Sequence, residues 1–329
     1  MFYIIGKQLL LASLSLFGIS LLFFMLVNNA ELYQQRYLVD DLLASESTNV
    51  VVRYFHYINS LMDGQWGYSI ASQKAIFHES VSLLPATIEL IFFAAMVAIT
   101  LGIAAGVLAG YYQNSWFDKT VLTITFVGYS TPIFWLGLVS ILIVSLEWGL
   151  APVSGRIGFL FEIEPVTGFI LIDLFLSDID NKSEPLMSII RHTTLPTLIL
   201  SLLPLAVTAR LTRNAMIEAL GSDYIQAAYA KGLSSTRIIW VHGLRNAMVS
   251  VAPNFGMQVG ALVMGALVVE TIFSWPGLGK WLIESVNRRD FPAIHGALLL
   301  LVGLSIFTNT LLGIVNTLLN PKMRSFEYV

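Results

Sequence analysis

The chain alternates between long apolar runs and polar segments. Six runs are long enough to cross a bilayer, at about residues 9–27, 85–112, 120–146, 195–215, 250–272 and 296–319. A helix needs roughly 20 apolar residues to cross a hydrocarbon core of about 30 Å. The pattern therefore predicts an all-α membrane protein with six transmembrane helices.

The first apolar run is predicted to remain as a membrane anchor. The apolar part of a cleaved signal peptide, the alternative, covers only about 7–15 residues and is followed by small residues. This run is longer and ends in Asn-Asn-Ala-Glu at residues 28–31. We expect residues 1–83 to form this helix and a polar segment. Within that segment residues 50–62 predict an amphipathic helix, with an apolar face made by Val51, Tyr54, Phe55, Ile58 and Met62.

The second and third spans contain residues that affect helix packing. Gly102, Gly106 and Gly110 share one face, and small residues at this spacing let helices approach closely in a bilayer. Pro85 is expected to open the second span, because a helix tolerates proline in its first turn. Pro132 interrupts the third span and removes a backbone hydrogen bond, which predicts a kink.

The distribution of Lys and Arg predicts the orientation. Six spans put both termini on one side of the membrane, and half of the 18 cations lie in short segments on that side. The other half are diluted over three longer acidic segments. Cations concentrated in short loops mark the cytoplasmic side, so we expect both termini and residues 216–251 to be cytoplasmic. The cations of the short segments are Lys7, Lys119, Arg210, Arg213, Lys231, Arg237, Arg245, Lys322 and Arg324.

Composition supports the membrane assignment and excludes other classes. Of 329 residues, 56% are hydrophobic and 12% are charged, with a mean hydropathy of +0.74. Soluble domains carry about 25% charged residues. The net charge of −3 gives no reason to expect nucleic-acid binding. The chain has 0 cysteines, which excludes disulfides and thiolate sites.

No pattern for catalysis, metal binding or cofactor binding is present. The five histidines are scattered over separate segments. The nearest approach to a phosphate-binding Walker A sequence is GLGKW at 277–281, which lacks the upstream Gly and the Ser or Thr after Lys280. We therefore expect a non-enzymatic chain that depends on a nucleotide-binding partner.

The cytoplasmic segment 216–251 contains QAAYAKG at residues 226–232. Its small residues Ala227, Ala228 and Ala230 would let another surface come close, and Gly232 tolerates the left-handed backbone found at helix C-termini. Gly221 and Asp223 predict a turn and an N-cap before this helix.

This segment resembles the EAA loop of ABC-importer permeases, in which Glu-Ala-Ala is followed by three residues and Gly. Gln226 stands in place of the Glu, and HGLRNA at 242–247 replaces a Pro, as in the peptide-permease branch. The resemblance implies a coupling helix that docks on a cytoplasmic ATPase and moves as a lever. The coupling residues it implies are Asp223, Tyr224, Gln226, Ala227, Ala228, Lys231, Gly232, His242, Arg245 and Asn246.

Further segments resemble the dipeptide, oligopeptide and nickel class of ABC permeases. In family order they are LPATIEL (84–90), STPIFWLG (130–137), PVSGR (152–156), ARLTRNAM (209–216), AKGLSSTRIIWVHGLRNA (230–247) and ETIFSWPGLGKWL (270–282). The insertion at 150–178 looks most like that of the Sap peptide-transport branch. The resemblance implies the type I importer permease fold with periplasmic loop insertions, a permease core at 84–320 and a cytoplasmic tail at 321–329.

The resemblance also implies the partners and the location. They are a second permease subunit (SapC-like), two cytoplasmic ABC ATPase subunits, a periplasmic substrate-binding protein and the lipid bilayer of the bacterial inner membrane. In that setting the chain forms half of a translocation pathway for cationic or antimicrobial peptides. Two alternatives remain: a putrescine or polyamine export permease, and a membrane scaffold that binds an ATPase without moving solute.

Several residues are candidates for the translocation path or a gate. An ionisable group inside a span is costly and by default a functional candidate, although a carboxylate can equally pair with a neighbour. Residues 273–279 are expected to form a rigid plug or docking loop. Arg210 and Arg213 are interpreted as anchors whose charges reach the interface. The path candidates are Glu89, Ser130, Pro132, Trp135, Glu270, Trp275 and Pro276.

Overall fold

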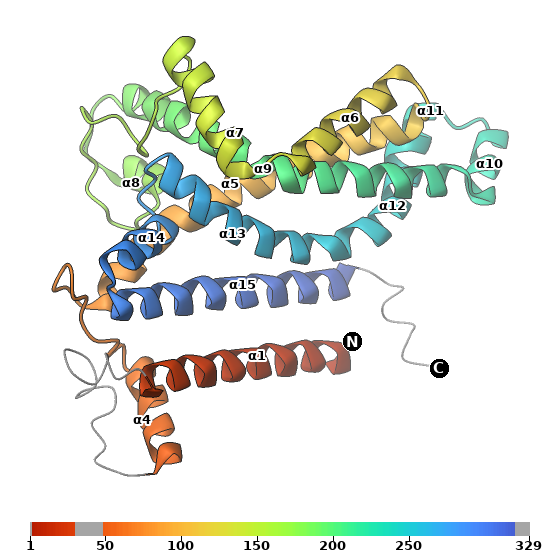
Figure 1. The fold of residues 1–329 in the computed structure, drawn as a ribbon. Helices are drawn as coiled ribbons and strands as arrows, with labels where there is room; N and C mark the ends of the chain where they lie inside the picture. The colour runs from red at the N-terminus through yellow and green to blue at the C-terminus, as the bar shows by residue number, and fades with distance from the viewer. Residues whose placement is uncertain (1, 30–48, 320–329) are drawn as a thin grey trace.

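The fold consists of long helices laid side by side (Figure 1). The structure is a computed structural model that describes residues 2–29 and 49–319. Residues 30–48 of the predicted polar segment and the predicted tail at 321–329 lie outside the described residues. Within the described ranges the secondary structure is helical, apart from one isolated bridge between Tyr68 and Ala75.

Among the described residues, six spans are present when a bent pair of helices is counted as one. This confirms the all-α, six-span prediction. The unbroken spans are α1 (Phe2–Asn29), α5 (Ile76–Tyr111), α9 (Ser183–Leu220), a helical run from Ser235 to Ile272 that ends in α13 (Phe255–Ile272), and α15 (Phe291–Leu319). The bent pair is α6 (Trp116–Ser130) with α7 (Ile133–Ser140), which continues as the π-helix η1 (Ile141–Glu147).

Short helices connect the spans at both ends of the bundle. At the end where α1 begins and α15 finishes lies α10 (Asp223–Ala230), while α4, α8 and α14 lie at the opposite end (Figure 1). The short elements are α4 (Val50–Met62), α8 (Ile170–Leu176), α10, α11 (Ser235–Arg237), the π-helix η2 (Ile238–Gly243), α12 (Leu244–Val251), the 3-10 helix η3 (Ala252–Asn254) and α14 (Leu278–Arg288).

The glycine face of α5 packs tightly against α9. A Cβ atom placed on Gly102, Gly106 or Gly110 would lie 2.5–2.8 Å from atoms of α9, including the carbonyl oxygen of Ala209. No side chain fits in so small a space, so the glycines are what lets these two helices approach. The predicted small-residue packing face is confirmed.

Helix α5 begins earlier than the sequence predicts. Pro85 does not open the span but lies inside a 36-residue helix that starts at Ile76. The backbone hydrogen bonds of a helix are internal to it, so the helix can continue through the polar residues that flank an apolar run. Glu89 therefore lies 13 residues after the start of α5.

The third span is broken rather than kinked. Helix α6 and the segment from Ile133 to Glu147 meet at 102°. Thr131, which precedes Pro132, has extended backbone angles (φ −92°, ψ 128°), because the proline ring disfavours a helical conformation in the residue before it. Helix α6 consequently ends at Ser130, and a new helix begins after Pro132 in a different direction.

The predicted amphipathic helix is present as α4, with a different buried face. Tyr57 is fully buried and packs with Phe24 of α1, and Tyr54 and Ile58 flank this contact. Val51, Phe55 and Met62, predicted on the same apolar face, are exposed. The contact with α1 fixes which side of the helix faces protein.

Candidate functional site

The predicted site residues fall into three separate places. The coupling residues lie at the end of the bundle where α10 is found. Ser130, Pro132 and Trp135 lie at the break between α6 and α7. Glu89, Glu270, Trp275 and Pro276 belong to a polar network around α5, α13 and the segment after α13.

Helix α10 is held by one apolar face. Ile225 and Ala228 are buried against Ile238, with Leu220 and Leu233 around them. The predicted role of Ala228 as part of an approachable surface is therefore wrong, because its methyl group faces inward. Ala227 and Ala230, on the other side of α10, are exposed as expected.

The two ends of α10 have defined geometry. The residue at the N-cap is Ser222, with extended φ and ψ angles, and Asp223 is the first helical residue. The predicted N-cap is thus displaced by one position. At the other end Gly232 has φ +78°, the left-handed conformation that the sequence predicts, and a Cβ atom there would meet nothing within 4 Å. The hydroxyl of Tyr224 donates to the carbonyl oxygen of His242 at 3.0 Å, which ties α10 to η2.

The coupling segment is attached firmly to the long helices. Met216 of α9 is fully buried with Val107 of α5, Ile239 of η2 and Ala247 of α12. On the outer side the remaining coupling residues form an exposed polar surface. Those residues are Asp223, Tyr224, Gln226, Ala227, Lys231, Gly232, Arg245 and Asn246, with His242 half-buried. Movement of this surface would be transmitted to α9 and α5 through packed side chains.

The break in the third span exposes main-chain polar groups. Pro132 has no N–H group to donate, and the hydrogen bonds of the described residues include none to the carbonyls of Gly128, Tyr129 or Ser130. Ser130, Pro132 and Trp135 are all exposed there. A hollow of about 400 Å³ lies beside the break, between α6, α7, α9 and α13.

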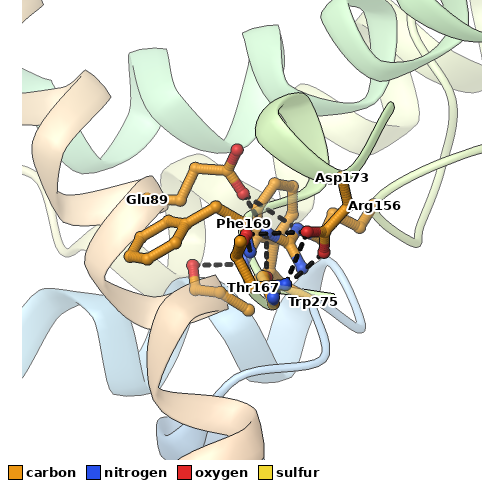
Figure 2. A network of polar contacts seen from close by, with 8 residues as sticks. Glu89, Arg156, Thr167, Phe169, Asp173 and Trp275 are labelled. Carbon is orange, nitrogen blue, oxygen red and sulfur yellow. Dashed lines mark hydrogen bonds and ion pairs between the residues drawn. The ribbon is translucent and has the colours of Figure 1, made fainter. Parts of the chain in front are cut away.

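The network at the opposite end is centred on an ion pair between Arg156 and Glu89 (Figure 2). Nε and Nη2 of Arg156 both donate to Oε2 of Glu89, the first at 2.9 Å, and Nη2 also donates to the carbonyl of Gly168 at 3.0 Å. The guanidinium lies over the ring of Trp275, 5.7 Å from its centroid. Glu89 is therefore paired with a neighbouring residue, which is one of the two alternatives that the sequence left open.

Trp275 and Glu270 fix the segment that follows α13. The indole N–H of Trp275, which is 0% exposed, donates to the carbonyl of Ala86 at 2.9 Å. Oε2 of Glu270 accepts from the backbone N–H groups of Gly279 and Lys280 at 2.7 and 3.1 Å. Glu270 thereby accepts hydrogen bonds from N–H groups in the first turn of α14, which have no partner within the helix. Pro276 is exposed between these two anchors.

Asp173 organises the insertion beside Arg156. Its carboxylate accepts from the hydroxyl and N–H of Thr167 at 2.6 and 2.7 Å and from the N–H of Gly168 at 3.0 Å (Figure 2). Burial alone would raise the pKa of Asp173, but these hydrogen bonds outweigh it and hold the pKa below the ordinary 3.8. The charged form of Asp173 is therefore part of the folded loop.

Sequence reasoning missed the partners in these contacts. Arg156 was identified only as part of PVSGR, and Asp173 had no assigned role. One signal was available, because a carboxylate such as Glu89 inside a span requires a cation nearby. Among the described residues no three His, Asp or Glu side chains are grouped to hold a metal ion.

Comparisons with known proteins agree with this architecture. Residues 98–325 match the family described as "Binding-protein-dependent transport system inner membrane component". The chain is 42% identical to the di/tripeptide transport system permease protein DppB of Pseudomonas aeruginosa, over 97% of this chain and 98% of that protein. It is 38% identical to two SapB proteins, over 80% of this chain and 83% of each. One is the peptide transport system permease of Salmonella typhimurium, and the other is named a putrescine export system permease in Escherichia coli. Identity and coverage are higher for the di/tripeptide permease, so these similarities do not single out the Sap branch.

Proposed function

The chain belongs to the family of binding-protein-dependent transport system inner membrane components, and we propose that it carries short peptides, including cationic ones, as one half of an ABC transporter. A second permease of SapC type would form the other half. Two cytoplasmic ATPases would supply energy, and a periplasmic binding protein would deliver the peptide.

The observation that carries this proposal is the exposed surface of α10. Its buried face is anchored to Ile238, while Gln226, Ala227 and Lys231 are exposed, and no side-chain hydrogen bond or ion pair ties Gln226 or Lys231 to the rest of the described chain. A short helix fixed on one side and free on the other is suited to docking. We place it, with both termini, on the cytoplasmic side, as the cation distribution predicts.

Packing around α10 supports a lever mechanism. ATPase closure would push α10, and the contacts among Met216, Val107 and Ile239 would carry the movement into α9 and α5. Tight packing of α5 on α9 makes the two helices move together. Such rigid-body rocking of spans around a central site is the physical basis of alternating access.

A preference for cationic peptides is supported by the charges of the outer segments. Six exposed carboxylates lie in or beside the insertion, at Glu147, Glu162, Glu164, Asp178, Asp180 and Glu184. They would attract cations toward the mouth. Glu89 does not contribute to this field as a free charge, since Arg156 is bound to it. The same carboxylates, and the printed name of the Escherichia coli relative, also support polyamine export as a second candidate.

The test is ATP-dependent flux in proteoliposomes that contain this chain with its co-purifying permease and ATPases. Labelled peptide and labelled putrescine are offered separately on each side. Peptide movement toward the ATP side that requires the binding protein is the expected result. Putrescine movement away from the ATP side would replace import with export, and ATPase binding without flux of either would favour the scaffold alternative.

A further inference from the structure

Two arginines of α9, one turn apart, have different surroundings. Arg213 donates to both carboxylate oxygens of Asp118 on α6, at 2.5 and 2.7 Å. Arg210 is exposed, and its side chain has no ion pair or hydrogen bond with the described residues. An unpaired charge within a membrane-spanning helix is expensive unless it meets water, a partner or a ligand. The fold therefore gives Arg213 a counter-charge, in Asp118, and gives Arg210 none among the described residues.

Arg210 borders a hollow between α6 and α9. Its volume is about 420 Å³, within the range of roughly 300–1,000 Å³ that is typical of small-molecule sites. The hollow combines apolar walls with the hydroxyl groups of Thr123, Thr125 and Tyr129 of α6. Among the described residues that line it, Arg210 of α9 is the one with a charge.

The broken span adjoins this hollow. Tyr129 lines both the Arg210 hollow and the hollow beside the break. The carbonyls of Gly128 and Ser130 have no donor within the described chain, and lipid cannot supply one. The face that contains the break and Arg210 must therefore meet water or polar groups, not acyl chains.

We propose that this face is a peptide-binding site on the translocation path, in which Arg210 binds the C-terminal carboxylate of the peptide. A guanidinium group can donate two parallel hydrogen bonds to one carboxylate, which is a bidentate contact. The free carbonyls at the break accept hydrogen bonds from the peptide's ammonium group. This inference rests on the proposed peptide-transport function and adds its substrate-selecting group.

The spacing of the two groups suits a short peptide. Thr123, which lines the Arg210 hollow, and Ser130, at the break, are seven residues apart along α6, or about 10 Å at ~1.5 Å per residue. An extended tripeptide spans about the same length at ~3.3–3.6 Å per residue. A polyamine has no carboxylate for Arg210, so this site favours peptides over polyamines.

The experiment compares transport of trialanine with that of trialanine amide, which lacks the carboxylate. Both are measured in proteoliposomes holding the complete complex and its unaltered binding protein, with wild type, Arg210→Gln and Arg191→Gln. Arg191 is an exposed arginine on the same helix, far from the hollow, and serves as the matched control. The quantity of interest is the ratio of acid to amide flux, because any contribution of the binding protein to this ratio is the same in every variant.

We expect Arg210→Gln to lower the ratio at least tenfold and Arg191→Gln to leave it unchanged. An unchanged ratio in Arg210→Gln would overturn the proposal, whether or not total flux falls, since Arg210 would then be an anchor. If the glutamine variant does not assemble, Arg210→Lys keeps the charge without the fork, and its ratio should fall partway; an unchanged ratio there would also reject the site. Absence of peptide flux in the wild type would instead reject the proposed function.

Discussion

The guanidinium of Arg156 lies between the carboxylate of Glu89 and the indole ring of Trp275, its central carbon 5.7 Å from the ring centroid. One side chain thus joins the loop after η1 to α5 and to the segment after α13. Since Arg156 also donates to Gly168, the insertion is fixed to the same point. Arg156 thus links three segments at the end of the bundle opposite α10.

Removing Glu89 should destabilise this network strongly. Glu89→Ala leaves Arg156 buried without its counter-charge, a change that costs about 3–5 kcal/mol in buried pairs. Thermal unfolding of the detergent-solubilised complex would measure the loss. The double variant Glu89→Ala/Arg156→Met should lose less than the sum of the single variants, and simple additivity would show that the pair is not coupled.

A substitution at Gly232 should uncouple ATP hydrolysis from transport. The left-handed φ of +78° disfavours other residues, and Gly232→Asp also adds a negative charge to the surface predicted to dock. We expect membrane insertion to be normal and substrate-stimulated ATPase activity of the complex to be abolished. Gly232→Asn is the matched control, because asparagine tolerates this conformation and adds no charge. Normal stimulation in the aspartate variant would contradict the coupling role.

The packing of α5 on α9 should not tolerate a side chain at Gly106. A Cβ atom there would lie 2.5 Å from the carbonyl of Ala209, and overpacking of this kind costs about 1–3 kcal/mol. Gly106→Val should lower the melting temperature of the complex. The control is Gly260→Val on α13, where nothing lies within 4 Å of the added Cβ. Equal melting temperatures for the two variants would refute the close approach.

The loop at 167–173 should weaken in acid. Asp173 has a pKa below 3.8 in the folded loop, so its contacts contribute stability fully above that pH, and this contribution is lost as the pH falls through the folded value. Hydrogen exchange of the Thr167 and Gly168 amides, which donate to Asp173, should accelerate below pH 3.8 beyond the intrinsic trend. Asp173→Asn removes the titrating group, so the acceleration should vanish. Its persistence in that variant would assign the effect to another group.

Sequence patterns predicted the features that depend on neighbours along the chain. The apolar runs predicted the spans, the glycines of α5 predicted its packing face, and Gly232 predicted the left-handed backbone at the end of α10. Each of these follows from local geometry or from the length needed to cross a bilayer. Helix boundaries such as Ile76 were missed, because polarity marks the membrane surface and not the end of a helix.

The sequence by itself determined the membrane class, the number of spans and the family resemblance, because these depend only on hydropathy along the chain and on contiguous motifs. Only the tertiary structure decided which charges are satisfied. Glu89 and Arg156 are 67 positions apart, and Asp118 and Arg213 are 95 apart. The folded chain pairs these charges, whereas the side chain of Arg210 has no partner in the part of the chain that the structure describes. A charge's energy depends on what surrounds it in space, and no local pattern records that.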